Sequence, residues 1–69
     1  MDRKVIEEIR GIFTKGTRVK LLEMDDPQAP PVGSWGTVTF VDDAGNIHVK
    51  WDEGGSLALI YGVDKCEIG

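Results

Sequence analysis

Residues 36–51 decide the fold of this chain, and they read GTVTFVDDAGNIHVKW. Two runs rich in β-branched and aromatic residues, 36–41 and 46–51, flank the turn-forming sequence DDAG. Apolar and polar residues alternate along each run, with the period of two that is typical of a strand with one buried face. The aspartates can cap turn amides and the glycine can take a positive φ, so the stretch predicts an antiparallel hairpin.

The alternation also assigns faces to the side chains of the hairpin. Val38 and Phe40 share one face of the first run, and Trp51 lies on the corresponding face of the second. We therefore expect Phe40 and Trp51 in the core. His48 falls on the polar face, and we interpret it as a surface histidine.

Three further short runs, at residues 17–22, 56–61 and 65–68, have strand-like composition. All three prolines fall within residues 24–34, which predicts an extended, polyproline-like loop between the first two strands. Short strands hide their edges best by curling into a small barrel. The predicted fold is mainly β, a five-stranded SH3-like barrel over residues 15–69. The competing OB barrel places its helix between strands rather than before them.

An amphipathic helix is predicted over residues 1–14, with Asp2 as its N-cap and Gly16 beyond its end. Its apolar side chains follow the spacing i, i+1, i+4, i+7, i+8, and they are Val5, Ile6, Ile9, Ile12 and Phe13. Such a stripe must dock. Two alternatives are left open here, docking on its own barrel and docking on a second copy in a homo-oligomer.

Length and composition exclude several classes of protein. A chain of 69 residues, 41% of them hydrophobic, makes one small domain, residues 1–69. One cysteine and one histidine cannot supply a disulfide within the chain or a zinc site built from several such ligands. The longest apolar run, 57–61, is far shorter than a membrane span needs. We expect a cytoplasmic protein with no membrane association.

Charge is unevenly distributed along the chain. The net charge is −4, yet residues 1–20 carry +3 and residues 21–69 carry −7. The acidic majority argues against general affinity for nucleic acid. A local basic patch with Arg18 and Lys20 keeps a nucleic-acid-associated barrel as the alternative function.

No group of residues makes a convincing catalytic or metal site. The acidic turns at 25–26, 42–43 and 52–53 are explained by hydrogen bonding within their own turns, and we expect no metal and no cofactor. His48 has no nucleophile at a suitable spacing, and Cys66 is interpreted as a small hydrophobic residue. We expect a protein that is not an enzyme; a small hydrolase is the third alternative.

The aromatic residues and the proline-rich loop give the candidate binding site. Trp35 stands at the exit of the loop and is free of the inward register, so it is a candidate contact residue for a protein or peptide. The loop prolines reduce the entropy lost on binding. The other candidate binding residues are Met24, Asp25, Asp26, Pro30, Pro31 and Tyr61. The alternative is that the loop plugs an open end of the barrel.

The order of motifs from about Lys15 to Ile68 resembles the bacterial and phage family called domain of unknown function 4314. The motifs that carry the resemblance are KGTRV at 15–19, MDDPQAPP at 24–31, GTV at 36–38, VDDAG at 41–45, VKWD at 49–52 and GVD at 62–64. The resemblance implies an SH3-like fold and a role in bacteria, phages or mobile elements, with no catalytic residues. We expect a non-enzymatic adaptor module in a bacterial or phage protein assembly.

Overall fold

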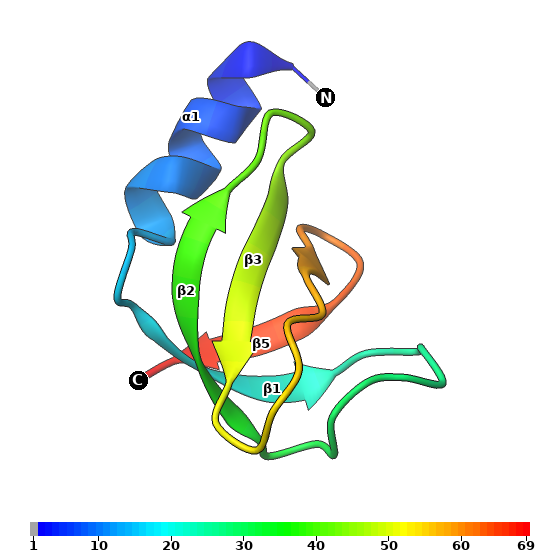
Figure 1. Cartoon of the computed structure of the whole chain (residues 1–69). Helices are drawn as coiled ribbons and strands as arrows, with labels where there is room; N and C mark the ends of the chain where they lie inside the picture. The colour runs from blue at the N-terminus through cyan, green and yellow to red at the C-terminus, as the bar shows by residue number, and fades with distance from the viewer. Residues whose placement is uncertain (1) are drawn as a thin grey trace.

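The computed structural model describes residues 2–69 as one helix followed by an antiparallel sheet of five strands, in the order β4-β3-β2-β1-β5 (Figure 1). The elements are α1 (Arg3–Ile12), β1 (Arg18–Glu23), β2 (Trp35–Val41), β3 (Asn46–Trp51), β4 (Leu59–Ile60) and β5 (Lys65–Ile68). This confirms the mainly β class, the five strands and the N-terminal helix.

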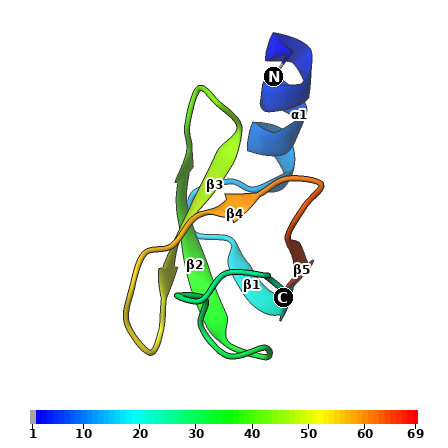
Figure 2. The same cartoon turned by 90° about the vertical axis from the view of Figure 1, so that its right-hand side faces the viewer.

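The sheet is curved but it does not close into the predicted barrel. Its edge strands β4 and β5 lie apart on one side of the molecule (Figure 2). The reason lies in β4, which has two residues where the sequence predicts six. The backbone of Ile60 accepts hydrogen bonds from the amides of Val63 and Asp64, and its own N–H donates to the Asp64 carboxylate at 2.8 Å. A local turn therefore occupies the groups that β4 would offer to a further strand.

The core lies on the concave face of the sheet. Its side chains come from four strands, α1 and the segment just after α1, and the most buried are Ile9, Val19, Leu21, Val38, Ile47, Val49 and Leu59. Trp51 is 2% exposed, and its indole N–H donates to the carbonyl of Leu57 at 3.0 Å. Its predicted place in the core is confirmed.

Phe40 is not a core residue, contrary to the sequence-based prediction. Val38 pairs with Val49, and Phe40 pairs with His48, so Thr39 is an extra residue that forms a β-bulge in β2. A bulge shifts the alternation by one residue, and Phe40 consequently faces outward with 54% of its surface exposed. Val41 takes the inward place.

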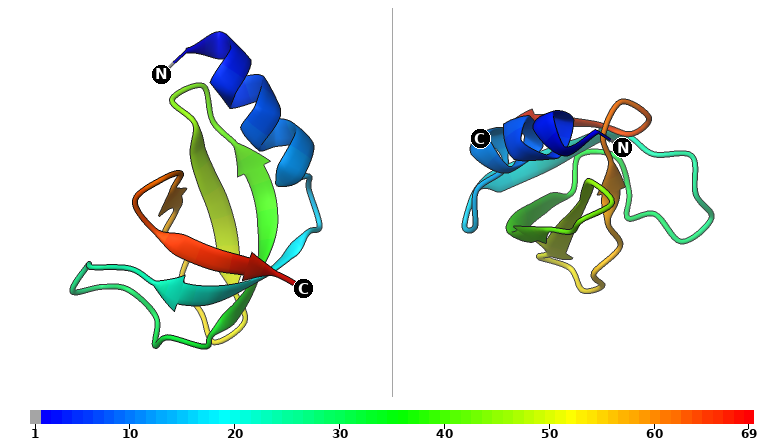
Figure 3. Two further views of the ribbon diagram at one scale, coloured as in Figure 1. Left: turned by 180° about the vertical axis from the view of Figure 1, so that it is seen from behind. Right: turned by 90° about the horizontal axis from the view of Figure 1, so that it is seen from above.

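Helix α1 docks on the sheet of its own chain, alongside β2 (Figure 3). Asp2 caps the helix by accepting from the Lys4 amide at 2.9 Å. Ile6, Ile9 and Phe13 are buried as the stripe predicts, whereas Ile12, at the edge of the stripe, is exposed. None of the described residues, 2–69, forms a helix long and apolar enough to cross a membrane.

Candidate functional site

A groove of about 480 Å³ lies between the two edge strands of the sheet. We call it the seam groove. Leu22, Ile60, Tyr61 and Cys66 line its sides, Phe13 lines it from the end of the helical segment, and the core residues Ile47 and Leu59 also line it.

The sides of the seam groove expose large apolar side chains. Leu22, Ile60 and Tyr61 are each between 43% and 48% exposed. Leu22 is exposed because the pairing of β1 with β5 shifts between Leu21 and Glu23, which leaves it as an unpaired extra residue. Apolar side chains gathered at one place on a small domain mark a binding surface more often than isolated ones do.

One wall of the seam groove also presents a free strand edge. The Gly69 amide donates to the Arg18 carbonyl at 2.9 Å. With the register of β5 on β1, this bond shows which residues of β5 direct their backbone groups toward β1. Backbone groups in an antiparallel ladder face the partner strand at every second residue. Glu67 therefore pairs with β1, and the N–H and C=O groups of Cys66 and Ile68 face the open side.

A smaller acidic hollow adjoins the seam groove and shares Ile60 and Asp64 with it. Met24, Asp25 and Asp26 of the proline-rich loop line this hollow, together with Asp64 and without any basic side chain among its lining residues. At the groove itself Lys65 lies 3.4 Å from Glu23, so its charge is already paired. The surroundings of the groove are consequently negative.

The predicted binding residues fall into separate places. Met24, Asp25 and Asp26 line the acidic hollow, and Tyr61 lines the seam groove. Pro30 lines a third hollow beside Trp51, while Pro31 is exposed. Of the predicted set, Met24, Asp25, Asp26 and Tyr61 thus lie on the adjoining hollow and groove, which share Ile60 and Asp64.

Trp35 does not belong to that surface, because it lines neither the seam groove nor the acidic hollow. It pairs with Lys20 on the outer face, where the guanidinium carbon of Arg18 lies 5.8 Å from the centre of its ring. Gly69 lies against the ring so closely that an added Cβ would collide with it. The Trp35 ring therefore lies beside Arg18 at the start of β1 and Gly69 just beyond β5.

The basic residues of β1 are largely compensated by acidic ones. Arg18 binds Asp52 with two hydrogen bonds of 2.7 and 2.6 Å and donates a third to Thr37. These contacts lower the pKa of Asp52 from its ordinary value and raise that of Arg18. Lys20 lies directly opposite Glu67 on β5. Such pairing reduces the positive potential that a nucleic acid would need.

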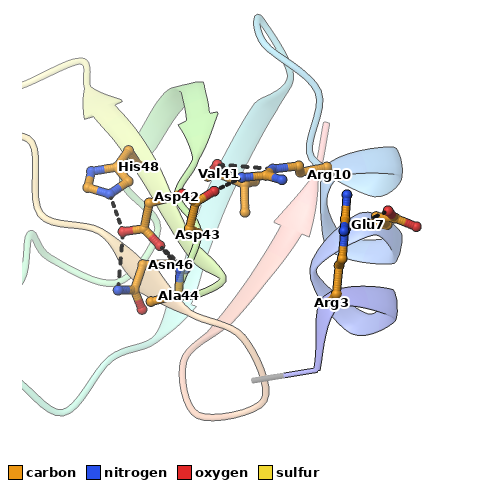
Figure 4. Close-up of polar contacts among 9 residues, drawn as sticks. All are labelled: Arg3, Glu7, Arg10, Val41, Asp42, Asp43, Ala44, Asn46 and His48. Carbon is orange, nitrogen blue, oxygen red and sulfur yellow. Dashed lines mark hydrogen bonds and ion pairs between the residues drawn. The ribbon is translucent and has the colours of Figure 1, made fainter.

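Asp42 and His48 form a polar cluster at the hairpin (Figure 4). The His48 ring nitrogen Nε2 lies 2.8 Å from the Asp42 carboxylate, which also accepts from the amides of Ala44 and Asn46. The hydrogen bond from His48, followed by that from Asn46, lowers the pKa of Asp42 to about 2. Asp26 accepts from the Gln28 amide in the same way. Asp26 and Asp42 act as turn caps, as predicted. Asp52 differs from that prediction, because its carboxylate binds Arg18 of β1 rather than its own turn.

Cys66 is half-buried in the wall of the groove, and this burial raises the pKa of its thiol. A thiol with a raised pKa is a weak nucleophile and a suitable apolar wall residue. Within residues 2–69 no three or more histidine, cysteine or carboxylate side chains are grouped closely enough to hold a metal ion.

The seam groove was missed by sequence reasoning, although a signal was present. Leu21-Leu22 and Leu59-Ile60 are adjacent apolar pairs, and a strand with one buried face cannot bury both members. One residue of each pair had to point elsewhere. Leu22 and Ile60 are these residues, and both point to the groove.

A comparison with protein families finds one that matches almost the whole chain. The model of the family described as a domain of unknown function (DUF4314) covers residues 2–68, which include the helix as well as the sheet. No curated protein and no solved structure matches the chain.

Proposed function

The chain belongs to the DUF4314 family, and we propose that it is a non-enzymatic protein-binding module of a bacterial or phage assembly, with the seam groove as its binding surface. The observation that carries the proposal is the set of half-exposed apolar side chains on the sides of the groove, Leu22, Ile60 and Tyr61. Large apolar and aromatic side chains of this kind are typical of protein contacts.

The nature of the groove supports binding rather than catalysis. Its walls combine aliphatic, aromatic and half-buried thiol groups with one carboxylate and one paired lysine. His48, which could act as a general base, does not line the groove and lies on the outer face of the hairpin, where its ring is stacked on Phe40. These contacts favour a binding module over the small hydrolase.

A nucleic-acid-associated barrel is the alternative, and the charges give it less support. Arg18 is held by Asp52, Lys20 lies beside Glu67, and the loop near the groove contributes Asp25 and Asp26. Phosphates would approach a mainly negative surface there.

Site-specific photocrosslinking tests the class of partner. A photoreactive phenylalanine analogue replaces Tyr61 in the groove, and in a matched control it replaces Phe40 on the outer face, which is similarly exposed. The chain is then irradiated in the cells that produce it. We expect a protease-sensitive adduct from position 61 that is absent from position 40.

Three results would contradict the proposal. A nuclease-sensitive adduct at position 61 would favour the nucleic-acid alternative. The same protein adduct from both positions would show that the groove is not the surface used, and no adduct from position 61 would leave the groove without a macromolecular partner.

A further inference from the structure

We infer that the seam groove binds an extended peptide segment of a partner protein, which pairs with β5 as a sixth strand and carries a basic residue between two apolar ones. This inference deepens the proposed function and rests on it. Pairing of this kind obtains affinity from backbone hydrogen bonds and specificity from alternate side chains.

The backbone of β5 determines where the peptide pairs. The N–H and C=O groups of Cys66 and Ile68 face away from β1, because the ladder between these strands is fixed by the bond from Gly69 to Arg18. The corresponding groups of Ile60 in β4 are already used by the turn at Val63 and Asp64. Among the two edges of the sheet, β5 is therefore the one that can accept a strand.

The topology also sets the direction of the peptide. Both β4 and β5 run antiparallel to their neighbours, and with the order β4-β3-β2-β1-β5 they run in the same direction. A strand inserted between them in the opposite direction makes antiparallel pairs with β5 and continues the pattern of the sheet. Antiparallel pairs are the more stable ones per residue.

The side chains of β5 predict the sequence pattern of the peptide. Cys66 lies opposite Leu21 and Ile68 lies opposite Val19, so both share the inner face of the sheet with core residues. Peptide residues opposite Cys66 and Ile68 point to that same face, and the one opposite Cys66 lies over the groove, which Cys66 lines. The residue opposite Cys66 is expected to be apolar because Leu22, Ile60 and Tyr61 line the groove with Cys66. The residue opposite Ile68 is expected to be apolar because it would cover the Ile68 side chain, which is 49% exposed.

The peptide residue between the two apolar ones lies opposite Glu67 on the outer face. Lys20 lies opposite Glu67 on its other side, in β1, so Glu67 is shared between the two neighbours. An opposite charge directly across a strand pair is favourable and a like charge is not, so this peptide residue is expected to be lysine or arginine. Asp64 at the groove, with Asp25 and Asp26 in the adjoining hollow, adds attraction for basic residues near the ends of the segment.

A second copy of the chain is a less suitable occupant. Each copy has a net charge of −4, and joining two copies at β5 would bring Asp64 and the acidic hollows toward one another. Like charges gathered at an interface disfavour it. A partner segment that carries a basic residue is instead attracted by these acidic groups.

The test is an NMR titration of the full chain with the capped heptapeptide Gly-Ser-Val-Lys-Val-Ser-Gly. We expect saturable shifts of the amide signals of Cys66 and Ile68, with slower hydrogen exchange at both, and shifts at Leu22, Ile60 and Tyr61. The same peptide with glutamate in place of lysine is expected to bind at least about fivefold more weakly.

Backbone-modified peptides separate strand pairing from simple apolar contact. N-methylation of the two valines removes the N–H groups that face β5, and this should abolish binding. N-methylation of the lysine removes an N–H that faces away from β5 and should preserve binding within about twofold, because this amide makes no bond to β5.

Variants of the protein provide the matching controls. Cys66→Pro removes the free N–H of β5 without removing a bond to β1, so it should fold and lose the peptide. Ile60→Lys places a like charge in the groove and should weaken binding of the lysine peptide at least about tenfold, since it removes apolar contact and adds repulsion. Val32→Lys adds the same charge at an exposed apolar site outside the groove and should change little.

Several results would overturn the inference. Binding that tolerates N-methylated valines, or that prefers the glutamate peptide, would exclude the proposed pairing. If light scattering shows that the wild type is a dimer and that Cys66→Pro is a monomer, the free edge of β5 binds a second copy of the chain instead. An absence of peptide shifts would also overturn it, and a protease-sensitive adduct at position 61 would then show that protein binding itself is retained.

Discussion

The ring of Phe40 lies flat on the imidazole of His48, with the ring centres 4.2 Å apart and the planes within 5° of parallel. His48 in turn donates to the Asp42 carboxylate, so the stack continues into the turn of the hairpin. The bulge at Thr39 makes this arrangement, because it turns Phe40 out of the core and onto the face that His48 occupies. The outer face of the hairpin thereby acquires its own aromatic contact.

The exposure of Phe40 gives a direct test of the bulge. Phe40→Ala should lower the free energy of unfolding by about 1 kcal/mol, the value of an exposed aromatic contact. Trp51→Ala should cost about 3–5 kcal/mol, which approaches the whole stability of so small a domain. Urea unfolding followed by circular dichroism measures both. Equal losses for the two variants would show that Phe40 is buried after all.

Gly36 predicts a second difference between two similar substitutions. A Cβ at this position would collide with the Cγ1 of Val49 and would lie 2.9 Å from Trp51 Cε3 and 3.1 Å from the Lys50 carbonyl oxygen. Gly36→Ala should therefore lower stability by about 1–3 kcal/mol. Gly11→Ala, where the helix leaves open space, should raise it by about 0.5–1 kcal/mol. Thermal unfolding would contradict this account if both variants shifted the melting temperature in the same direction.

The sequence predicts local structure well where one period dominates. The helix, the hairpin and the core position of Trp51 follow from regular spacing, and all three are found. The outward position of Phe40 could not be derived in this way. The bulge at Thr39 reverses the face of every later residue in β2, and nothing in the composition of the strand indicates where a bulge occurs.

Long-range relations were harder to predict than the elements themselves. The open side of the sheet depends on the turn that caps Ile60, and this turn depends on the placement of Asp64 four residues later. The sequence YGVD at 61–64 predicts a turn, but the strand-like composition at 56–61 does not show that this turn would cap Ile60. The seam groove follows from this one local competition, which explains why the candidate site was only partly anticipated through Tyr61.

The pKa of Asp42 predicts a specific loss of stability in acid. The folded value, about 2, is below the ordinary 3.8, so the charged form stabilises the fold fully above the ordinary pKa. That contribution is lost as the pH falls from about 4 toward 2. Asp42→Asn keeps an acceptor for the turn but has no charge to lose.

Melting temperatures of both proteins, measured between about pH 2 and 6, test this prediction. The wild type should be more stable than Asp42→Asn at the upper end, and the difference should disappear at the lower end. Other carboxylates that titrate, Asp52 among them, are common to both proteins and cancel in the difference. If the difference in melting temperature between the two proteins stays constant with pH, Asp42→Asn acts through altered hydrogen-bond geometry and not through loss of the carboxylate charge.

The docking of α1 gives the last prediction, through two isoleucines on the same helix. Ile9 is fully buried between the helix and the sheet, so Ile9→Ala should lower the free energy of unfolding by about 2–5 kcal/mol and leave much of the chain unfolded. Ile12 is exposed, so Ile12→Ala should change stability by about 0.5 kcal/mol or less. If the helix instead docked on another copy, dilution would lower the melting temperature of the wild type. We expect a melting temperature independent of concentration, because Ile6, Ile9 and Phe13 are buried within a single chain.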